Sequence, residues 1–463
     1  MKMINRHYSI YIGLILVVTT ACKKEFLDAK PSSDIVAPAT LEELNMLLEN
    51  VNVINKTGAL AQVSSDDYRI VSDQSFLSLP TTTERNAYLW QTDIYEGENN
   101  NDWNIPYSQV FYANSVLQVI KDKNLDLSAE GNITKGWAYF VRAYALFDLA
   151  RNFASCYRKE TATEDLGVPL RLSAGVDEII QRSSLKETFE RILDDLTIAA
   201  NLLQIGIPEK NRNRPSKVAA FAMKARVFLY MGEYIEAERY ADSTLLYHDK
   251  LIDYNTISKT SDTPFGYNSD EVIYQSTQVV SYGLSSGVGN SMSAIEVNPD
   301  LYRLYEMNDL RKAIYFKINS LRNINMKRGY IGAGIYNFTG LATDEIYLIK
   351  AECLARRGEL KQSMDVLNQL LVMRFNNKEP YIRLIAASAS EALATILRER
   401  RKQLIWRSLR WSDLKRLNKE GDQITLTRII NNITYTLGPN DPRYVFPIPD
   451  QEINNSGIQQ NIR

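Results

Sequence analysis

Apolar residues recur at intervals of three and four along most of the chain, the spacing that gathers them on one face of an α-helix. This spacing predicts helices over residues 39–50, 106–121, 135–155, 184–204, 216–231, 233–247, 343–357, 359–375 and 390–418. The first of these opens with a Thr-x-x-Glu capping signal at Thr40 and Glu43. Strand-like runs are short and scattered, as at 271–280 and 312–318. The pattern predicts a mostly α-helical protein with irregular insertions.

Two of the predicted helix pairs resemble each other. "KARVFLYMGEYIEAERY" and "KAECLARRGELKQSMDV" align without gaps, 126 positions apart, so that Ala225 matches Ala351 and Gly232 matches Gly358. Small residues let antiparallel helices approach closely, and a glycine suits the turn between them, as in a tetratricopeptide helix pair. The pairs are not in tandem. Long insertions separate them, and binding surfaces tend to lie on such insertions.

The N-terminus has the pattern of an export signal. Lys2 and Arg6 precede an apolar run from residue 10 to 18, which is too short to span a membrane, and "TTAC" follows it. A cut before Cys22 would leave that cysteine as an acylated N-terminus, so we predict a lipoprotein signal over residues 1–21. Ordinary secretion with a chance cysteine is the alternative. Acyl chains such as palmitate hold a folded domain on a membrane.

Composition argues against nucleic acid as a partner. The chain has 54 basic and 55 acidic residues, which provide no net attraction for a polyanion, and an exported protein rarely meets genomic nucleic acid. One basic strip stands out: residues 397–417, "LRERRKQLIWRSLRWSDLKRL", hold eight Lys or Arg against two acids. If its helix is unbroken, Leu397, Leu404, Trp411 and Leu414 share one face, and many basic groups are free to pair with acids. We therefore interpret the strip as structural.

No sequence motif of catalysis is present. His248 is the only histidine after the signal, and the chain has no Cys-x-x-Cys, His-Glu-x-x-His, phosphate loop or nucleophile elbow. The glycines of residues 282–291 open no convincing helix, so a dinucleotide site is a weak hypothesis. Cys156 and Cys353 lie in apolar helical surroundings, and whether they form a disulfide stays open. Composition leaves a carboxylate pair of the glycosidase type open, because Asp and Glu are abundant.

Aromatic residues are the better functional signal. Tyrosine occurs 27 times against 14 phenylalanines. Sugar rings stack on flat aromatic side chains, and sugar hydroxyls pair with amides, carboxylates and guanidinium groups. Trp90 lies in the polar segment "TTTERNAYLWQTD" and is the leading candidate for such a contact; the alternative is that its ring packs inside the protein. The full predicted ligand-binding set is Trp90, Tyr88, Tyr68, Arg69, Asp66, Asp67 and Asp93. Asp66 and Asp67 are poor candidates for one catalytic pair, because neighbours in a strand point opposite ways.

Several stretches together resemble the SusD/RagB lipoproteins of Bacteroidetes-type bacteria, in the family's order. They are "CKKEFLDAKPSS", "FVRAYALFDLARNFA" followed by "LGVPLRL", "RSSLKETFERILDDLTIAANLL", "NRPSKVAAFAMKARVFLYMGEYIEAERYAD", "DEIYLIKAECLARRGEL", "RERRKQLIWRSLRWSDLKRL" and "YVFPIPDQEINNSGIQQN". The basic strip resembles the family's Glu-Arg-Arg helix. The family usually has Glu-Gly where this chain has Arg407 and Ser408, a departure expected to alter a local turn or pairing.

The resemblance implies an all-α, SusD-like fold of tetratricopeptide-like helix pairs with long loop insertions and minor β-hairpins. It implies a signal at 1–21 and one ligand-binding domain at 22–463, with an N-terminal part at 22–215 and a C-terminal part at 216–463. It also implies a lipid-anchored outer-membrane protein facing the cell exterior. Such a protein captures oligosaccharides and delivers them to a SusC-like TonB-dependent transporter. The resemblance implies no catalysis, so we predict no enzymatic activity, no cofactor and no metal site.

Three alternatives remain open. Some branches of the family bind peptides, as RagB-type proteins do. A surface glycosidase would need two carboxylates at a defined spacing across one cleft. A scaffold or adhesion protein would need no ligand pocket.

Overall fold

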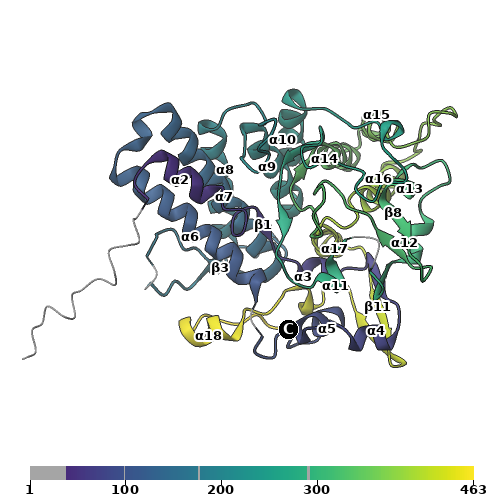
Figure 1. Ribbon diagram of the computed structural model, residues 1–463, viewed down its shortest axis with the longest axis horizontal. Coiled ribbons are helices and arrows are strands. Elements are labelled where there is room, and N and C mark those ends of the chain that lie inside the picture. The colour runs from purple at the N-terminus through teal and green to yellow at the C-terminus, as the bar shows by residue number, and fades with distance from the viewer. Residues whose placement is uncertain (1–37, 99, 176–177, 289–291) are drawn as a thin grey trace, which may run out of the picture. The chain divides into compact units, whose positions relative to one another are not determined.

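Helices dominate the computed structural model, which describes residues 38–98, 100–175, 178–288 and 292–463 (Figure 1). The helices are α2 (Leu41–Leu48), α3 (Leu60–Ser64), α4 (Asp73–Leu77), α5 (Thr82–Tyr88), α6 (Asn101–Asp122), α7 (Ala129–Phe153), α8 (Leu185–Leu202), α9 (Lys217–Met231), α10 (Tyr234–Tyr247), α11 (Gly283–Ser286), α12 (Pro299–Arg303), α13 (Arg311–Tyr315), α14 (Thr343–Arg356), α15 (Leu360–Leu371), α16 (Ala389–Gln403), α17 (Arg410–Lys419) and α18 (Asp450–Ser456). The all-α prediction with minor β-structure is confirmed. Cys22 and the signal at 1–21 lie outside the described residues.

The strands form only two-stranded sheets within the described residues. They are β1 (Lys56–Thr57), β2 (Tyr68–Ile70), β3 (Leu166–Pro169), β4 (Arg182–Ser184), β5 (Val272–Tyr274), β6 (Thr277–Gln278), β7 (Ile295–Val297), β8 (Phe316–Ile318), β9 (Ile324–Met326), β10 (Leu341–Ala342), β11 (Leu426–Ile430) and β12 (Ile433–Leu437). β1 pairs with β6 in parallel, and the pairs β2–β7, β3–β4, β5–β10, β8–β9 and β11–β12 are antiparallel. Of the two predicted strand runs, 271–280 contains β5 and β6. The run 312–318 is only partly a strand, because α13 occupies its first residues.

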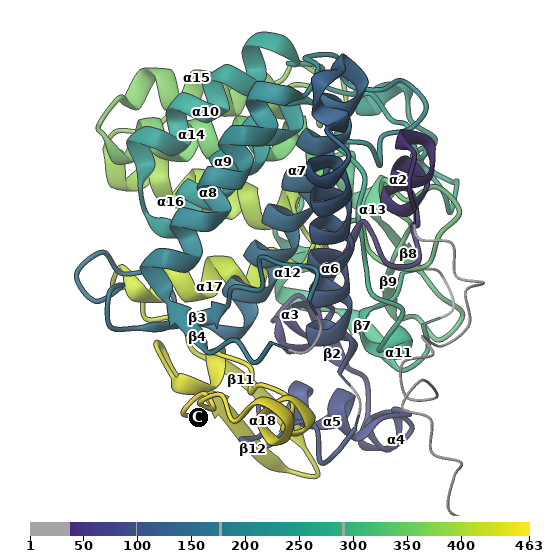
Figure 2. The ribbon, with the colours of Figure 1, turned by 90° about the vertical axis from the view of Figure 1, so that its left-hand side faces the viewer.

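The long helices pack in sequence order, α6 on α7, α7 on α8, α8 on α9 and α9 on α10, and the row continues through α14 to α15 and α16 (Figure 2). Residues 41–463 form one compact unit, which includes both sides of the predicted boundary at 215/216. That boundary stays a prediction. We call residues 248–288 and 292–342, which lie between the α9–α10 and α14–α15 pairs, the insertion.

The internal repeat has the same turn in both copies. Gly232 and Gly358 have left-handed φ angles of 84° and 87°. The amide of Glu233 donates to the carbonyl of Phe228 (3.0 Å), and the amide of Glu359 donates to that of Leu354 (2.9 Å). Two helix pairs 126 residues apart therefore close through one hydrogen-bond pattern, which only glycine adopts without strain at its left-handed position.

We expect Ala351→Leu to destabilise the protein by about 1–3 kcal/mol. Ala351 is fully buried on α14, as its repeat partner Ala225 is on α9, so added methylenes have no room. The matched control is Ala394→Leu on α16, where the side chain is exposed; a change within about 0.5 kcal/mol is expected there. Thermal unfolding of both variants measures the difference, and equal melting temperatures would contradict the close helix approach.

Candidate functional site

The predicted aromatic group surrounds a cation of the protein itself. Tyr68, Tyr88 and Trp90 are only 2%, 3% and 1% exposed. The guanidinium carbon of Arg428, on β11, lies 3.7 Å from the ring centre of Tyr88, 4.5 Å from that of Trp90 and 5.6 Å from that of Tyr68. The structure brings the three predicted rings together, but as a cage for an internal arginine.

Trp90 is held on several sides. Its φ of 54° lies in the left-handed region, and its indole N–H donates to the carbonyl of Ser64 at 3.0 Å. The expectation that Trp90 presents an open face is wrong, because Arg428 and the α3 segment cover the ring. A role for Trp90 in ligand affinity stays a prediction. Because the ring is buried, its effect on affinity would be indirect, through the residues that it supports.

The four polar residues of the predicted set have different partners in the structure. Asp66 pairs with Arg401 and Arg410, with nearest N–O distances of 2.7 Å. Asp67 is 1% exposed, and burial together with neighbouring Asp66 raises its pKa to about 6. Arg69 pairs with Glu296 across the β2–β7 ladder, and Asp93 accepts from the amides of Tyr95 and Glu96. The structure does not bring these four together as one polar site.

The basic strip is two helices. α16 ends at Gln403 and α17 begins at Arg410, and between them Trp406 and Ser408 take left-handed φ angles of 63° and 54°. The expectation of an unbroken helix is therefore wrong. The family's usual glycine at the position of Ser408 suits this conformation. The pairing expectation is confirmed, for example by the contact of Arg416 with Glu352 and by that of Arg407 with Asp344.

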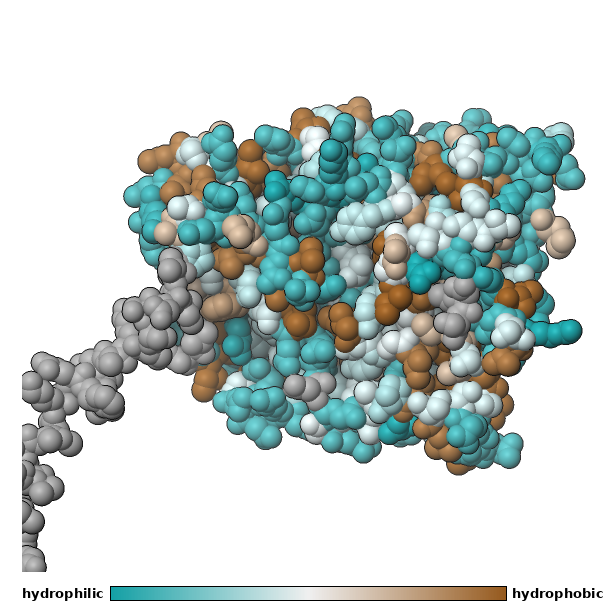
Figure 3. Space-filling view, in the orientation of Figure 1, coloured by the Kyte–Doolittle hydropathy of each residue, from teal (hydrophilic) through white to brown (hydrophobic). Residues whose placement is uncertain are grey.

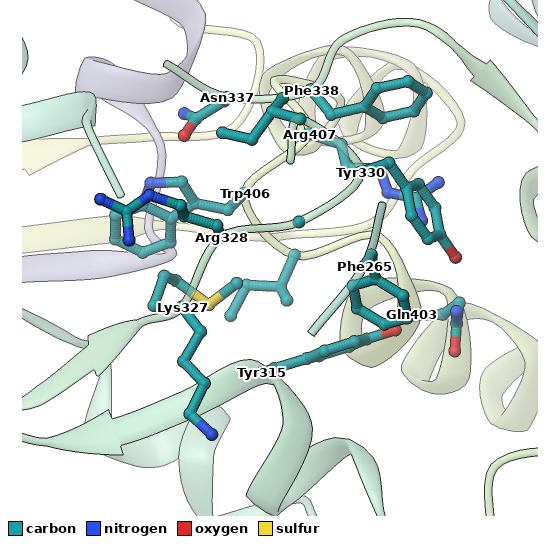
Figure 4. A pocket seen from close by; sticks show the side chains of 14 residues that line it. Phe265, Tyr315, Lys327, Arg328, Tyr330, Asn337, Phe338, Gln403, Trp406 and Arg407 are labelled. Atoms are coloured by element: carbon teal, nitrogen blue, oxygen red, sulfur yellow. The ribbon is translucent and has the colours of Figure 1, made fainter. Parts of the chain in front are cut away.

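A cavity opens where the strip's break meets the insertion (Figure 4). The space between its lining residues is about 460 Å³, part of which is open to solvent. Phe265, Tyr315, Met326, Ile331, Phe338 and Trp406 give it largely apolar walls. Figure 4 shows Arg328, Asn337 and Trp406 on one side and Phe265 and Tyr330 on the other.

The floor of the cavity is a buried ion-pair network. Arg407 donates two hydrogen bonds to Asp344, at 2.9 and 2.6 Å. Burial alone would raise the pKa of Asp344, but the Arg407 guanidinium offsets this and holds it below its ordinary value. Glu271 pairs with Arg374, and burial raises the pKa of Glu271. Because these groups already satisfy one another, the floor orients the walls and offers a ligand little polar bonding.

Of the polar side chains Arg328 and Asn337, which both line the cavity, only Arg328 keeps donors open. The Arg328 Nε–H donates to the carbonyl of Gly334 at 2.9 Å, while its two terminal NH₂ groups donate to no acceptor in the described part of the chain. Asn337 is 1% exposed; its Nδ2 donates to Gln278, and its Oδ1 has no hydrogen-bond partner among described residues. Because this oxygen is itself buried, it is an unsatisfied acceptor inside the protein and is not presented to a ligand.

The cavity shares one hydrophobic cluster with two of the three predicted rings, Tyr68 and Tyr88, while Trp90 belongs to another cluster. The ring of Trp406 lies against that of Tyr68, with centroids 5.7 Å apart, and the Trp406 amide faces Asp67 Oδ2 at 3.4 Å. Tyr68, Tyr88, Trp406, Phe265 and Phe338 all belong to the shared cluster. Tyr68 and Tyr88 therefore pack behind the cavity wall and do not line the cavity.

Sequence reasoning missed Arg328, Asn337 and Trp406 as site residues. Trp406 was counted with the structural strip, and no motif surrounds the other two. One signal did point to them, since both lie in the long insertion between the repeated helix pairs.

The structure adds no catalytic constellation in its described residues. Cys156 and Cys353 are free thiols, which answers the disulfide question. His248 Nε2 lies 2.8 Å from the carbonyl of Asp270, and burial lowers the pKa of His248. Groups of three or more His, Cys, Asp or Glu suited to a metal ion do not occur in the described part.

Family models match two parts of the chain. A SusD-like model described as starch-binding and associating with the outer membrane matches residues 25–229, and a model of the SusD family matches residues 336–462. The fold is that of a mostly helical protein whose paired helices are separated by an insertion that lines a cavity. The two models together match most of the chain, which belongs to the SusD/RagB family. A search of curated proteins finds no match.

Solved structures share the fold. A putative sugar-binding protein from Bacteroides vulgatus has a TM-score of 0.72 at 21% identity, covering 92% of this chain and 99% of its own. A SusD superfamily protein from Bacteroides thetaiotaomicron has a TM-score of 0.70 at 19% identity, covering 92% and 100%. A SusD-like carbohydrate-binding protein from Bacteroides vulgatus has a TM-score of 0.65 at 18% identity, covering 91% and 97%.

The described helices include none with the length and apolar character needed to cross a membrane. On the face drawn in Figure 3, hydrophilic residues predominate and hydrophobic ones form separate small patches.

Proposed function

We propose that this protein captures oligosaccharides at the cell surface and delivers them to a SusC-like TonB-dependent outer-membrane transporter. The observation that carries the proposal is the cavity of aromatic walls with an open guanidinium at Arg328. Flat rings and directional polar groups are the two features that a sugar ring needs. Family membership and the sugar-binding names of the structural relatives support the same ligand class.

Titration calorimetry of the mature chain against a panel of oligosaccharides tests the ligand class. We expect at least one glycan to bind without release of new reducing ends, because catalytic carboxylates do not line the described cavity. New reducing ends would favour the glycosidase alternative, and binding confined to peptides would favour the RagB-type alternative. Co-purification with a co-expressed SusC-like barrel from the same organism tests the transporter partner.

We further propose that Cys22 carries the lipid anchor. A Cys22→Ala variant is expected to move from the membrane fraction to the soluble fraction, because the acyl chains supply the membrane affinity, about 0.8 kcal/mol per buried methylene. Cys156→Ala serves as the control, since Cys156 is a free thiol far along the chain. If the Cys22→Ala protein stays with the membrane, the anchor lies elsewhere.

A further inference from the structure

The side chains that line the cavity bring positive charge without a matching carboxylate. Lys327, Arg328 and Arg407 line it, and no aspartate or glutamate of the described chain does. The charge of Arg407 is balanced, because its guanidinium donates two hydrogen bonds to the carboxylate of Asp344. The charges of Lys327 and Arg328 remain to be matched.

Neither of these two cations has a carboxylate partner within the described residues. The Lys327 Nζ donates to the carbonyls of Lys259 and Ala313, at 2.6 and 2.8 Å, and burial lowers the pKa of Lys327. Arg328 is half-buried, and its Nε–H donates to the carbonyl of Gly334. Its two terminal NH₂ groups meet no acceptor in the described part of the chain. Arg328 therefore keeps both an unmatched charge and a free pair of donors.

The surrounding sequence adds to this excess of positive charge. Residues 310–342 contain six basic residues and no acidic one, although the whole chain is nearly neutral. Arg311 and Lys317 have carboxylate partners, and the other four have none among the described residues. The β8–β9 hairpin, with Arg322 exposed at its turn, leads directly into Arg328. The insertion thus brings unpaired positive charge to the cavity.

Three classes of sugar respond differently to an unmatched guanidinium. A neutral sugar offers hydroxyl oxygens as acceptors but leaves the charge of Arg328 unmatched. An amino sugar brings a like charge, which is repelled. A sugar that carries a carboxylate or a sulfate ester can accept from both terminal NH₂ groups, and such charge-assisted hydrogen bonds are roughly twice as strong as neutral ones. Its ring can still lie against the apolar walls, so an acidic sugar uses both features of the cavity.

We propose that the cavity takes an acidic sugar, whose oxyanion pairs with the guanidinium of Arg328. The inference rests on the proposed glycan-capturing function and narrows its substrate class to oligosaccharides with a uronic acid or a sulfated residue. These two sources share the oxyanion chemistry and form separate arms of the test. An acidic peptide carries the same group, and a peptide ligand is the competing outcome.

Matched oligosaccharides that differ only in their charged group provide the test. Calorimetry of the mature chain compares cellotriose with its uronic acid form, in which each primary alcohol is oxidised to a carboxylate, and trigalacturonate with its methyl ester. Lactose sulfated on its galactose, compared with lactose, forms the sulfate arm, and a capped acidic dipeptide forms the peptide arm. We expect the acidic member of at least one sugar pair to bind roughly tenfold or more tightly, the effect of one or two charge-assisted hydrogen bonds. The advantage should shrink as salt is added, because salt screens an ion pair that is partly open to solvent.

Variants tie that preference to Arg328. Arg328→Met should reduce the acidic advantage roughly tenfold. Arg322→Met removes the same charge from the exposed turn of the same hairpin and should leave the advantage unchanged. Arg328→Lys keeps the charge without the pair of NH₂ groups and should keep part of the advantage. Melting temperatures of both Arg328 variants close to that of the wild type establish that the loss is one of binding.

Each other outcome overturns the inference in a distinct way. If sugars bind with no advantage for the acidic members, the oxyanion pairing is wrong and glycan capture stands. If only the dipeptide binds, or if nothing binds in this panel or among neutral oligosaccharides, glycan capture fails with it. An advantage that survives in Arg328→Met would place the oxyanion outside this cavity. If Arg322→Met reduces the advantage as much as Arg328→Met does, the attraction belongs to the whole hairpin surface and not to the cavity.

Discussion

Arg428→Met is expected to destabilise the protein by about 3 kcal/mol or more. The Arg428 guanidinium donates to the carbonyls of Ser65, Val63 and Tyr88, and three aromatic rings surround it. Val63 keeps a second donor in the hydroxyl of Tyr68, but no other donor reaches the carbonyls of Ser65 and Tyr88 in the described chain. Methionine fills similar space and leaves those two carbonyls buried without a partner.

Urea unfolding at neutral pH measures the loss. Arg69→Met is the matched control, because Arg69 is an exposed arginine on β2 that makes one ion pair, with Glu296. Exposed pairs contribute about 0–1 kcal/mol, so that variant should unfold close to the wild type. If Arg428→Met has the same free energy of unfolding as the wild type, Arg428 does not hold the N-terminal segment to the β11–β12 hairpin. In that case Arg428 would not occupy the rings of Tyr88 and Trp90, and both would again be candidates for contact with a ligand.

The sequence predicted features that depend on residues close together in the chain, and it missed those that depend on residues far apart. Helices α9, α10, α14 and α15 follow from a periodicity that repeats within one turn, and their shared glycine turn follows from local backbone geometry. Arg428 lies 340 positions from Tyr88, and nothing in the neighbourhood of either residue indicates the other. The cage was therefore hidden, although its three rings were recognised as a group.

Polar neighbours misled the prediction for Trp90 for the same reason. Glu84 lies six positions before it and suggested a solvated segment, yet Glu84 is fully buried and accepts from the amide and hydroxyl of Ser285. A polar residue next to an aromatic one marks a surface only if its partner is water. Here the partner is 201 residues away, in the insertion.

For the basic strip, the local pattern was sufficient to predict a structural role. It was not sufficient to predict the break between α16 and α17. Eight basic residues beside a near-neutral composition already favoured internal pairing, and the pairs with Glu352, Asp344 and Asp66 are present. At the break, the ring of Trp406 packs against Tyr68 and against the insertion. Helical periodicity carries no information about such a contact.

Asp66→Ala is expected to cost about 3 kcal/mol at neutral pH, because it leaves two partly buried arginines without their carboxylate. Arg410 donates to both oxygens of Asp66, and Arg401 donates to one of them, so this single side chain fastens the start of β2 to both helices of the strip. The matched control is Asp300→Ala, whose pair with Arg303 is largely exposed and whose loss should change stability by less than about 1 kcal/mol.

The pH dependence of the Asp66 effect is the sharper measurement. Burial alone would raise the pKa of Asp66, but Arg410 and Arg401 more than offset it and hold that pKa well below its ordinary value. A carboxyl group with a depressed folded-state pKa stabilises the fold fully above the unfolded-state pKa, about 3.9, and loses that contribution as the pH falls toward the folded-state value. Asp67 titrates near pH 6, partly because of Asp66, so both proteins are compared in an Asp67→Asn background. In that background the gap between the parent and its Asp66→Ala variant in urea unfolding should be constant from pH 7 to pH 5 and narrow below about pH 4. A gap that is already small at pH 7, or that stays constant down to pH 2.5, would contradict an ion pair at this position.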